Sequence, residues 1–491
     1  MSGERWTRAA LVALLLLSFA LRLRGLGRDG LHLDEAGQAW AATQPMLPEM
    51  LAIERTHAMA MPFDYLITRA TAGLSDAEFV LRLPSAVWAT LNVALLYALT
   101  RLLIGRRTEA LLVAFLLALS PLHIAYAQVL RFYASLSAFY VLACLLLYRA
   151  IRRPTPGRWT AFGVATLVGA YFHPFVLTAP VNGAVYFLLA GAMRPANRAA
   201  LGRFVVAGLL VAALFLPGFL VFGVHQQYDF DTFQFSESLE RVILSGLDWT
   251  TRLYNTPDPT ATAWLWANAA FAALGLAALL WRRRAMPLSL VLGAALSVGL
   301  IVAAVTLRGY WLLPRQLFHL TQVGIFLAAV GMGGAARGLT RWIGGWERSR
   351  AARLVLVAGL AVFVAAAARP VLGGRYATVT STGREAATAL LAQYRPGVPV
   401  YIIPGYELQS LQYYLDRPDA APAGIRLQPT TAEALAAAVA ADDGPIFLAL
   451  LSGGTPEELR PYTDLGFTVV FDNTTLSGRR YLLLLREAAA P

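Results

Sequence analysis

Long apolar segments recur along almost the whole chain, and they constrain its fold more than any other feature. The first covers residues 6–23. Ten more follow, at 79–100, 108–124, 133–149, 159–173, 175–192, 204–224, 262–281, 287–306, 316–335 and 353–369. A helix needs about 20 mainly apolar residues to cross the hydrocarbon core of a bilayer, and several of these segments are shorter. The sequence therefore predicts a polytopic α-helical membrane protein with about eleven transmembrane helices.

The composition agrees with this fold class. The chain is 57% hydrophobic and 14% charged, whereas a soluble domain carries roughly 25% charged residues. The formal net charge of +12 would suggest a nucleic-acid partner in a soluble protein. Here we expect no nucleic acid, because membrane loops account for the arginines. The single cysteine, Cys144, lies in an apolar segment and is expected to be a small buried side chain.

Arginines are concentrated in alternate loops, and most acidic residues lie in the others. The arginine-rich loops are at residues 101–107, 149–158, 194–203, 282–284 and 337–350. Because basic loops stay in the cytoplasm, this pattern predicts a cytoplasmic N-terminus and an outer C-terminus. We expect the protein to lie in the cell (plasma) membrane. Arg22, Arg24 and Arg28 are then expected to be interface anchors for the first helix.

Two of the outer loops, 25–78 and 225–261, are longer than ordinary connections, which is typical of functional loops. After residue 370 the pattern changes to alternating short strands and helices, which predicts an α/β domain with a largely parallel sheet. We therefore predict a transmembrane catalytic domain over 1–370 and a small extracytoplasmic α/β domain over 371–491.

Two adjacent carboxylates, Asp34 and Glu35, follow the first apolar segment. Charges close to hydrocarbon are unfavourable, so such residues are candidates for function. Further along the same loop, Glu54 and His57 are three residues apart and would share one face of a helix. They are weak candidates for a divalent metal site.

Other candidates lie in the same loop and in later outer turns. Asp64 and Tyr65 follow Pro62, at the expected start of a surface helix. Arg131 and Tyr133 precede an apolar segment without any other charge, and a guanidinium there suits a phosphate. Two more outer arginines and a histidine complete the set: Arg308, Arg315 and His173. The histidine is either a helix-end cap or a polar contact in the cavity.

In sequence order, these residues resemble a known family. The set comprises Asp34-Glu35, a proline-containing apolar motif, Gln128-x-x-Arg131-x-Tyr133, and Leu-Pro-Arg315-Gln-Leu-Phe. It is similar to the GT-C membrane glycosyltransferases, in particular to the protein mannosyltransferase and aminoarabinose transferase group of glycosyltransferase family 39. The resemblance covers about residues 1–370. One motif departs: where members often have His-x-Pro-Pro-Leu-Tyr-Tyr, this chain has His57-Ala-Met-Ala-Met-Pro-Phe-Asp64-Tyr65.

The resemblance implies a polyprenyl-phosphate-sugar donor and an acceptor lipid, glycan or protein on the outer face of the bilayer. It also implies that Asp34 is the catalytic base, with Glu35 beside it, and that Arg131 and Arg315 hold the donor phosphate. A single displacement would invert the anomeric centre. No cofactor is required, although a divalent metal stays open.

Three other functions compete with this prediction. A secondary transporter would show internal repeats and mid-span charges, and neither is seen. A lipid-linked glycan polymerase or ligase would depend on His225, Arg241 and Arg252 in the second long loop. An inactive scaffold would use its exterior domain to bind a partner.

Overall fold

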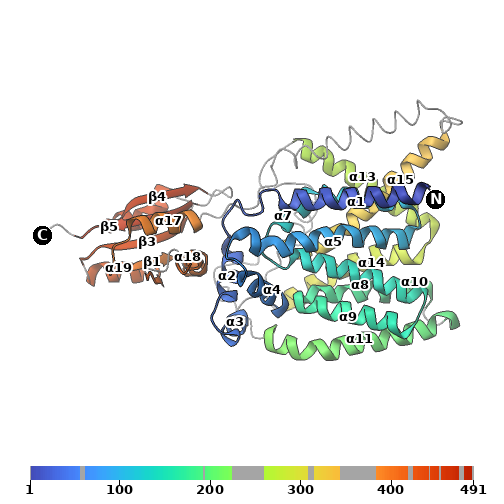
Figure 1. Cartoon of the computed structure of the whole chain (residues 1–491), viewed down its shortest axis with the longest axis horizontal. Helices are drawn as coiled ribbons and strands as arrows, with labels where there is room; N and C mark the ends of the chain where they lie inside the picture. Colours follow the sequence, from blue (N-terminus) through green and yellow to red (C-terminus); the bar gives the residue numbers. More distant parts are fainter. Residues whose placement is uncertain are drawn as a thin grey trace.

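The computed structural model describes residues 2–55, 61–191, 194–223, 259–307, 314–342, 383–417, 424–441, 443–452, 455–474 and 480–488. A bundle of long helices forms one part of the molecule, and a small sheet with helices on both faces forms the other (Figure 1). The short helices α2, α3 and α4 lie at the end of the bundle that faces the sheet. The N-terminus lies at the opposite end of the bundle.

The bundle is built from helices that follow the apolar segments closely. They are α1 (Ser2–Leu23), α5 (Glu78–Ile104), α6 (Arg107–Ala118), α8 (Tyr133–Arg152), α9 (Pro156–Phe172), α10 (Ala179–Ala190), α11 (Pro195–Phe222), α13 (Pro259–Arg282), α14 (Ala285–Leu307) and α15 (Thr321–Trp342). In the described part of the chain, six helices are long and apolar enough to cross a membrane. The predicted segment 353–369 lies outside the described residues, so the number eleven stays a prediction.

One expected helix is interrupted. The sequence predicts a single segment over 108–124, but α6 ends at Ala118 and the separate helix α7 covers Pro121–Ala127. Pro121 is the reason, because proline lacks the amide hydrogen that an internal helical turn needs. Ser120 caps the new helix, since its side chain accepts a hydrogen bond from the His123 amide.

Arg22 is not the interface anchor that the loop pattern predicts. Its side chain is 0% exposed, and it donates hydrogen bonds to the Ser18 hydroxyl and to the carbonyl oxygens of Leu117 and Ala118. These carbonyls belong to the last turn of α6, where a cation is favourable. Arg22 therefore joins the C-terminal ends of α1 and α6.

The bundle is centred on α8, most of which is buried. Close helix packing is clearest between α13 and α15. A Cβ atom at Gly275 would lie 2.1 Å from the Leu327 carbonyl oxygen, and one at Gly331 would lie 1.9 Å from that of Phe271. Small residues that let helix backbones approach in this way are typical of membrane proteins.

The segment between α1 and α5 is helical, as predicted for residues 25–78. It contains α2 (Leu33–Ala42), α3 (Leu47–Glu54) and α4 (Pro62–Ala72). We call residues 25–77 the outer segment. Pro48 and Pro62 stand in the first turns of α3 and α4, where a missing amide hydrogen costs nothing.

The C-terminal part, residues 383–488, contains the predicted alternation of strands and helices, but its sheet is mixed. The strands are β1 (Val400–Ile403), β2 (Leu427–Pro429), β3 (Ile446–Ser452), β4 (Thr468–Thr474) and β5 (Arg480–Arg486), in the spatial order β2-β1-β3-β5-β4. The pairs of β1 are parallel, whereas β5 pairs antiparallel with both β3 and β4. The prediction of a largely parallel sheet is therefore wrong. The last strand follows β4 through a hairpin connection that is too short for a crossover helix.

Helices cover both faces of this sheet. On one face lie α17 (Gly383–Gln393) and α18 (Leu408–Leu415), and on the other lie α19 (Ala432–Ala441) and α20 (Pro456–Thr463). Alternate residues of β3 point to the two faces: Phe447 packs with α17 and α18, and Leu448 packs with α19 and α20.

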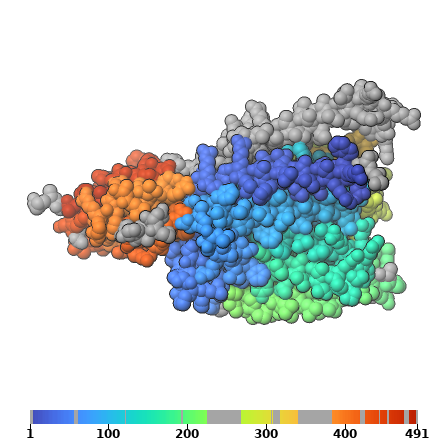
Figure 2. All heavy atoms as spheres, viewed as in Figure 1, coloured from blue at the N-terminus to red at the C-terminus, as the bar shows by residue number. Residues whose placement is uncertain are grey.

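We call residues 2–342 the membrane part. The hydrophobic core under α17 and α18 continues into it. Leu31, Ala36 and Ala39 of the outer segment belong to the same buried cluster as Leu411 and Tyr414 of α18. Figure 2 shows the atoms of the two parts in contact. The C-terminal part and α2 therefore share one core.

Candidate active site

The candidate site is formed where α2, α4 and the turn before α8 meet. Asp34 is the second residue of α2, which begins at the capping residue His32. A carboxylate in the first turn of a helix is stabilised by the helix dipole. Arg131 comes from the turn before α8, and its Nη1 atom lies 3.4 Å from the Asp34 carbonyl oxygen. The fold thus brings together two predicted site residues that are far apart in sequence.

Arg131 is held in place by Gln38 and keeps donors to spare. Its Nη1 atom donates to the Gln38 Oε1 at 3.2 Å, while its buried Nε atom has no hydrogen-bond partner among the described residues. Burial opposes the charge, but Asp34, Tyr65 and other nearby groups raise the pKa of Arg131 above its ordinary value. Arg131 therefore stays positively charged and can bind an anion.

Glu35 has a different environment from Asp34, although the two are adjacent. Its carboxylate accepts two hydrogen bonds from Arg82, at 2.8 and 2.7 Å, one from the Leu130 amide at 2.6 Å and one from the His32 amide at 3.1 Å. These bonds use all four lone-pair sites of a carboxylate. Burial opposes ionisation, but Arg82 and His32 lower the pKa of Glu35 to about 2. Glu35 therefore helps to fix two site residues. Asp34 precedes it in the sequence, and Arg131 follows Leu130, whose amide binds the Glu35 carboxylate.

Asp64 and Tyr65 lie at the start of α4, and both side chains are close enough to Arg131 to interact with its charge. The Gln38 side chain donates to the Asp64 Oδ2 at 2.8 Å and to the Thr68 hydroxyl at 2.8 Å. Burial raises the pKa of Asp64, although Gln38 and Arg131 oppose this. Burial also raises the pKa of Tyr65, so that its phenol stays neutral. Gln38 thereby connects Asp64 to Arg131.

Glu54, the last residue of α3, is a buried carboxyl group of a different kind. Its side chain is 0% exposed, and neither of its oxygens has a hydrogen-bond partner in the described part of the chain. Burial, reinforced by the nearby Asp64, raises the pKa of Glu54 to about 8. Glu54 is therefore largely protonated at neutral pH.

His173 is a helix cap. Its Nδ1 atom accepts a hydrogen bond from the Phe175 amide at 3.2 Å, at the start of the short helix η1 (Pro174–Thr178). Its ring stacks on Phe132, with 4.0 Å between the ring centroids. Burial, His319 and Arg131 hold its pKa well below the ordinary value, so the ring is neutral. The structure thus shows the cap, and a polar contact of His173 in the cavity stays a prediction.

The remaining predicted residues are described only in part. Tyr133 is the first residue of α8 and is buried, with its ring 4.7 Å from that of Tyr126. Arg315 lies in the short helix η2 (Pro314–Leu320). His57, Arg308 and the loop residues His225, Arg241 and Arg252 lie outside the described residues.

A metal site would need more ligands than the described residues supply. Within those residues, no group of three or more His, Cys, Asp or Glu side chains is arranged to hold a metal ion. The predicted pair Glu54 and His57 stays a prediction, because His57 lies outside the described residues.

Two residues that matter for the site are absent from the sequence prediction. Arg82 lies inside the apolar segment of α5, and a charge within such a segment is itself a signal of function or pairing. Gln38 is four residues after Asp34 and so shares its face of α2. Neither signal identifies the partner, which comes from another element.

The arrangement as a whole suits transfer of a group to a hydroxyl. Asp34 provides a carboxylate that can accept a proton, and Arg131 provides a fixed cation for a leaving anion. Both belong to segments at the end of the helix bundle that faces the sheet (Figure 1).

Comparison with known proteins shows what the chain is similar to. Residues 59–221 match the family described as Dolichyl-phosphate-mannose-protein mannosyltransferase. The fold matches solved structures of GT-C fold glycosyltransferases along the whole chain. The expected resemblance to GT-C membrane glycosyltransferases is therefore confirmed, and the chain is a multi-pass membrane protein.

The similar structures include two of ArnT from Cupriavidus metallidurans, one bound to undecaprenyl phosphate and one in the apo state. The first has a TM-score of 0.60 at 15% identity and covers 99% of each chain. The second has a TM-score of 0.61 at 15% identity and covers 100% of each chain.

A third structure is the oligosaccharyltransferase AglB from Archaeoglobus fulgidus, in complex with an inhibitory peptide and a dolichol-phosphate. It has a TM-score of 0.56 at 13% identity and covers 84% of this chain and 64% of that protein. No curated protein matches the chain in sequence. At these identities the likeness concerns the fold.

Proposed function

We propose that the protein is a glycosyltransferase that moves a hexosyl or pentosyl group from a polyprenyl-phosphate-sugar donor to an acceptor hydroxyl. The observation that carries this proposal is the meeting of Asp34 and Arg131, a base and a phosphate-binding cation from separate segments. Two of the matched structures contain bound lipids, undecaprenyl phosphate in ArnT and dolichol-phosphate in AglB. This supports a donor of the same chemical class.

In the proposed reaction, Asp34 accepts the proton of the acceptor hydroxyl while the oxygen attacks the anomeric carbon. The bond between that carbon and the phosphate oxygen breaks, and the polyprenyl phosphate leaves with the electron pair. Arg131 stabilises the developing charge in a site of low dielectric constant. A single displacement of this kind inverts the anomeric centre.

The other predicted residues take supporting roles in this proposal. Arg308, Arg315 and Tyr133 help to hold the donor phosphate. His57, Asp64 and Tyr65 line the cavity for sugar or acceptor, with His173 behind Arg131. Glu35 positions Asp34 and Arg131.

The proposal also places the site on the extracytoplasmic face of the plasma membrane, with the N-terminus in the cytoplasm. It is supported by the arginine pattern of the loops. The division into a catalytic domain, 1–370, and an extracytoplasmic domain, 371–491, belongs to the same proposal. The acceptor is a lipid, a glycan or a protein.

The test is a transfer assay in membranes with a panel of labelled polyprenyl-phosphate sugars. Asp34→Asn is expected to lower the rate by about 10²–10⁴-fold, because it removes the base. Asp29→Asn, in the same outer segment, is the matched control and is expected to keep the wild-type rate. Equal rates in Asp34→Asn and the wild type would overturn the proposal.

The same assay separates the alternatives. A polymerase or ligase would lose activity with His225→Ala or Arg241→Gln and keep it with Asp34→Asn. A transporter would move its substrate across vesicles without forming a new glycosidic bond.

A further inference from the structure

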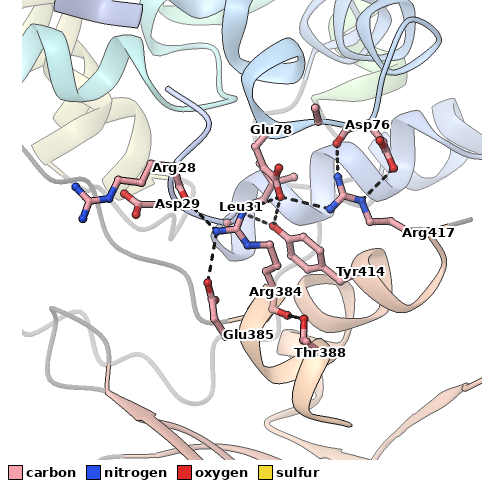
Figure 3. Close-up of polar contacts among 12 residues, drawn as sticks. Arg28, Asp29, Leu31, Asp76, Glu78, Arg384, Glu385, Thr388, Tyr414 and Arg417 are labelled. Atoms are coloured by element: carbon pink, nitrogen blue, oxygen red, sulfur yellow. Dashed lines mark hydrogen bonds and ion pairs between the residues drawn. The ribbon is translucent and has the colours of Figure 1, made fainter. Parts of the chain in front are cut away.

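Tyr414 of α18 connects the C-terminal part to the residue that precedes α2. Its hydroxyl accepts a hydrogen bond from the Leu31 amide at 2.5 Å and donates one to the Glu78 Oε1 at 3.3 Å. All three residues are buried. Figure 3 shows the phenol hydroxyl pointing toward both partners, which belong to the membrane part.

Two arginines of the C-terminal part hold Glu78 in place for this contact. Arg384 and Arg417 each lie 3.5 Å from the Glu78 Oε1. Arg417 also contacts Asp76, through its Oδ2 at 3.1 Å and its carbonyl oxygen at 2.5 Å. Figure 3 shows these dashed contacts converging on Glu78 and Asp76. A half-buried network with several charged members is stronger than isolated surface pairs.

The position of Leu31 gives the contact its importance for the site. Leu31 precedes His32, the capping residue of α2, and Asp34 follows in the first turn. The Leu31 amide has to find an acceptor, because a buried amide without one is costly. Tyr414 is that acceptor, so the start of α2 is tied to α18.

The other contacts that α2 makes with α18 are weaker. Ala36 and Ala39 present only small side chains to α18, and Trp40 reaches Asp416 through an exposed hydrogen bond of 3.3 Å. On its other side, α2 is attached to the rest of the membrane part by Glu35, which binds Arg82 and the Leu130 amide, and by Gln38, which donates to Asp64. Asp34 therefore lies between the contact with Tyr414 and these attachments to the membrane part.

We propose that Tyr414 is a positioning residue, through which the C-terminal part fixes Asp34 relative to Arg131. The proposal rests on the proposed function, since it assigns Asp34 the role of base. Without the Tyr414 hydroxyl, the Leu31 amide loses its acceptor and the first turn of α2 becomes free to shift. A small displacement of the base slows the transfer step while donor binding at Arg131 continues.

The test compares Tyr414→Phe with Tyr413→Phe. Both variants remove one hydroxyl oxygen from neighbouring tyrosines of the same helix, but the Tyr413 hydroxyl donates to the Asp76 carbonyl oxygen, at 3.3 Å, rather than holding the Leu31 amide. We expect Tyr414→Phe to lower kcat about tenfold with little change in the KM for the donor. We expect Tyr413→Phe to retain the wild-type kcat.

A second measurement does not depend on activity. Hydrogen exchange of the amides of residues 31–36 is expected to accelerate in Tyr414→Phe and to stay unchanged in Tyr413→Phe. Arg417→Gln keeps the phenol but loosens Glu78, and is expected to give a smaller acceleration. If Tyr414→Phe is recovered in low yield, Arg417→Gln provides a second test of the same contact.

The outcomes separate the two proposals. Equal exchange and equal kcat in the two tyrosine variants would overturn the role of Tyr414. Faster exchange in Tyr414→Phe, combined with full transfer in Asp34→Asn, would overturn the proposed function and leave the link between α18 and α2 intact. A parallel fall in kcat and in folded protein for both variants would show a purely structural role and would also overturn the proposal.

Discussion

Two buried glutamates of the outer segment have opposite environments. Glu35 at the start of α2 accepts four hydrogen bonds and has a pKa lowered to about 2. Glu54 at the end of α3 accepts none from the described residues and has a pKa raised to about 8. Burial is nearly complete in both cases, at 1% and 0% exposed.

The difference shows that burial alone does not decide what a carboxyl group does. Around Glu35 the fold supplies an arginine and two amides, so the charge is used to hold elements together. Around Glu54 the described residues supply no such partner, and the charge effect on its pKa comes from another acid, Asp64. A buried carboxyl group without a hydrogen bond reduces stability.

The largest expected effect concerns the first of these regions. Glu35→Gln leaves Arg82 buried without its counter-charge and is expected to lower the free energy of unfolding by about 3–5 kcal/mol. Because the folded-state pKa of Glu35 lies below the ordinary 4.5, its stabilisation is full above that pH and is lost as the pH falls towards 2. Denaturant unfolding of the purified protein at several pH values measures both effects.

The double variant Glu35→Gln with Arg82→Gln is the control. It removes both charges, so it should be less unstable than the sum of the single variants. Additive losses would contradict a direct interaction.

The second region should respond in the opposite direction. Glu54→Gln is expected to stabilise the protein, by on the order of 3 kcal/mol at pH 7. Below pH 4.5 the carboxyl group is protonated in both states, and the gain disappears. Between pH 4.5 and about 8 the folded state needs an extra proton, so the gain grows with pH and then levels off.

The melting temperature as a function of pH measures this gain. Glu49→Gln is the matched control in the same helix, because that carboxylate accepts a hydrogen bond from the Met46 amide and glutamine can still accept it. A gain for Glu54→Gln that is independent of pH would contradict the raised pKa. A gain in stability together with slower transfer would place Glu54 in the site.

The smallest expected effect on stability concerns Gln38, which lies in α2 after Glu35 and binds Asp64 of α4. Gln38→Met keeps the length of the side chain but removes its bonds to Asp64, Thr68 and Arg131. We expect a loss of stability of about 1–2 kcal/mol. Gln44→Met, whose side chain bonds only the Trp40 carbonyl oxygen at 3.0 Å among the described residues, should change the unfolding free energy less. Equal losses would show that Gln38 contributes no more than an ordinary surface glutamine.

Much of the fold follows from local patterns. The apolar segments predict the bundle helices because a bilayer requires continuous apolar helix, and Pro62 predicts where α4 begins. The break at Pro121 is a local signal that the predicted segment 108–124 misses. The strands and helices after residue 383 follow from their alternation. The direction in which the strands pair does not follow from this alternation, because β5 joins β3 antiparallel through long-range contacts.

For the candidate site, the sequence alone pointed to Asp34, Glu35 and Arg131 as unusual charges in apolar surroundings. It could not distinguish the two adjacent acids, because their difference depends on partners from other segments. Arg82 comes from α5, Leu130 from the turn before α8, and Tyr414 from the C-terminal part. Local sequence determines where helices begin and which charges need an explanation, whereas long-range contacts decide which charge is neutralised and which stays available.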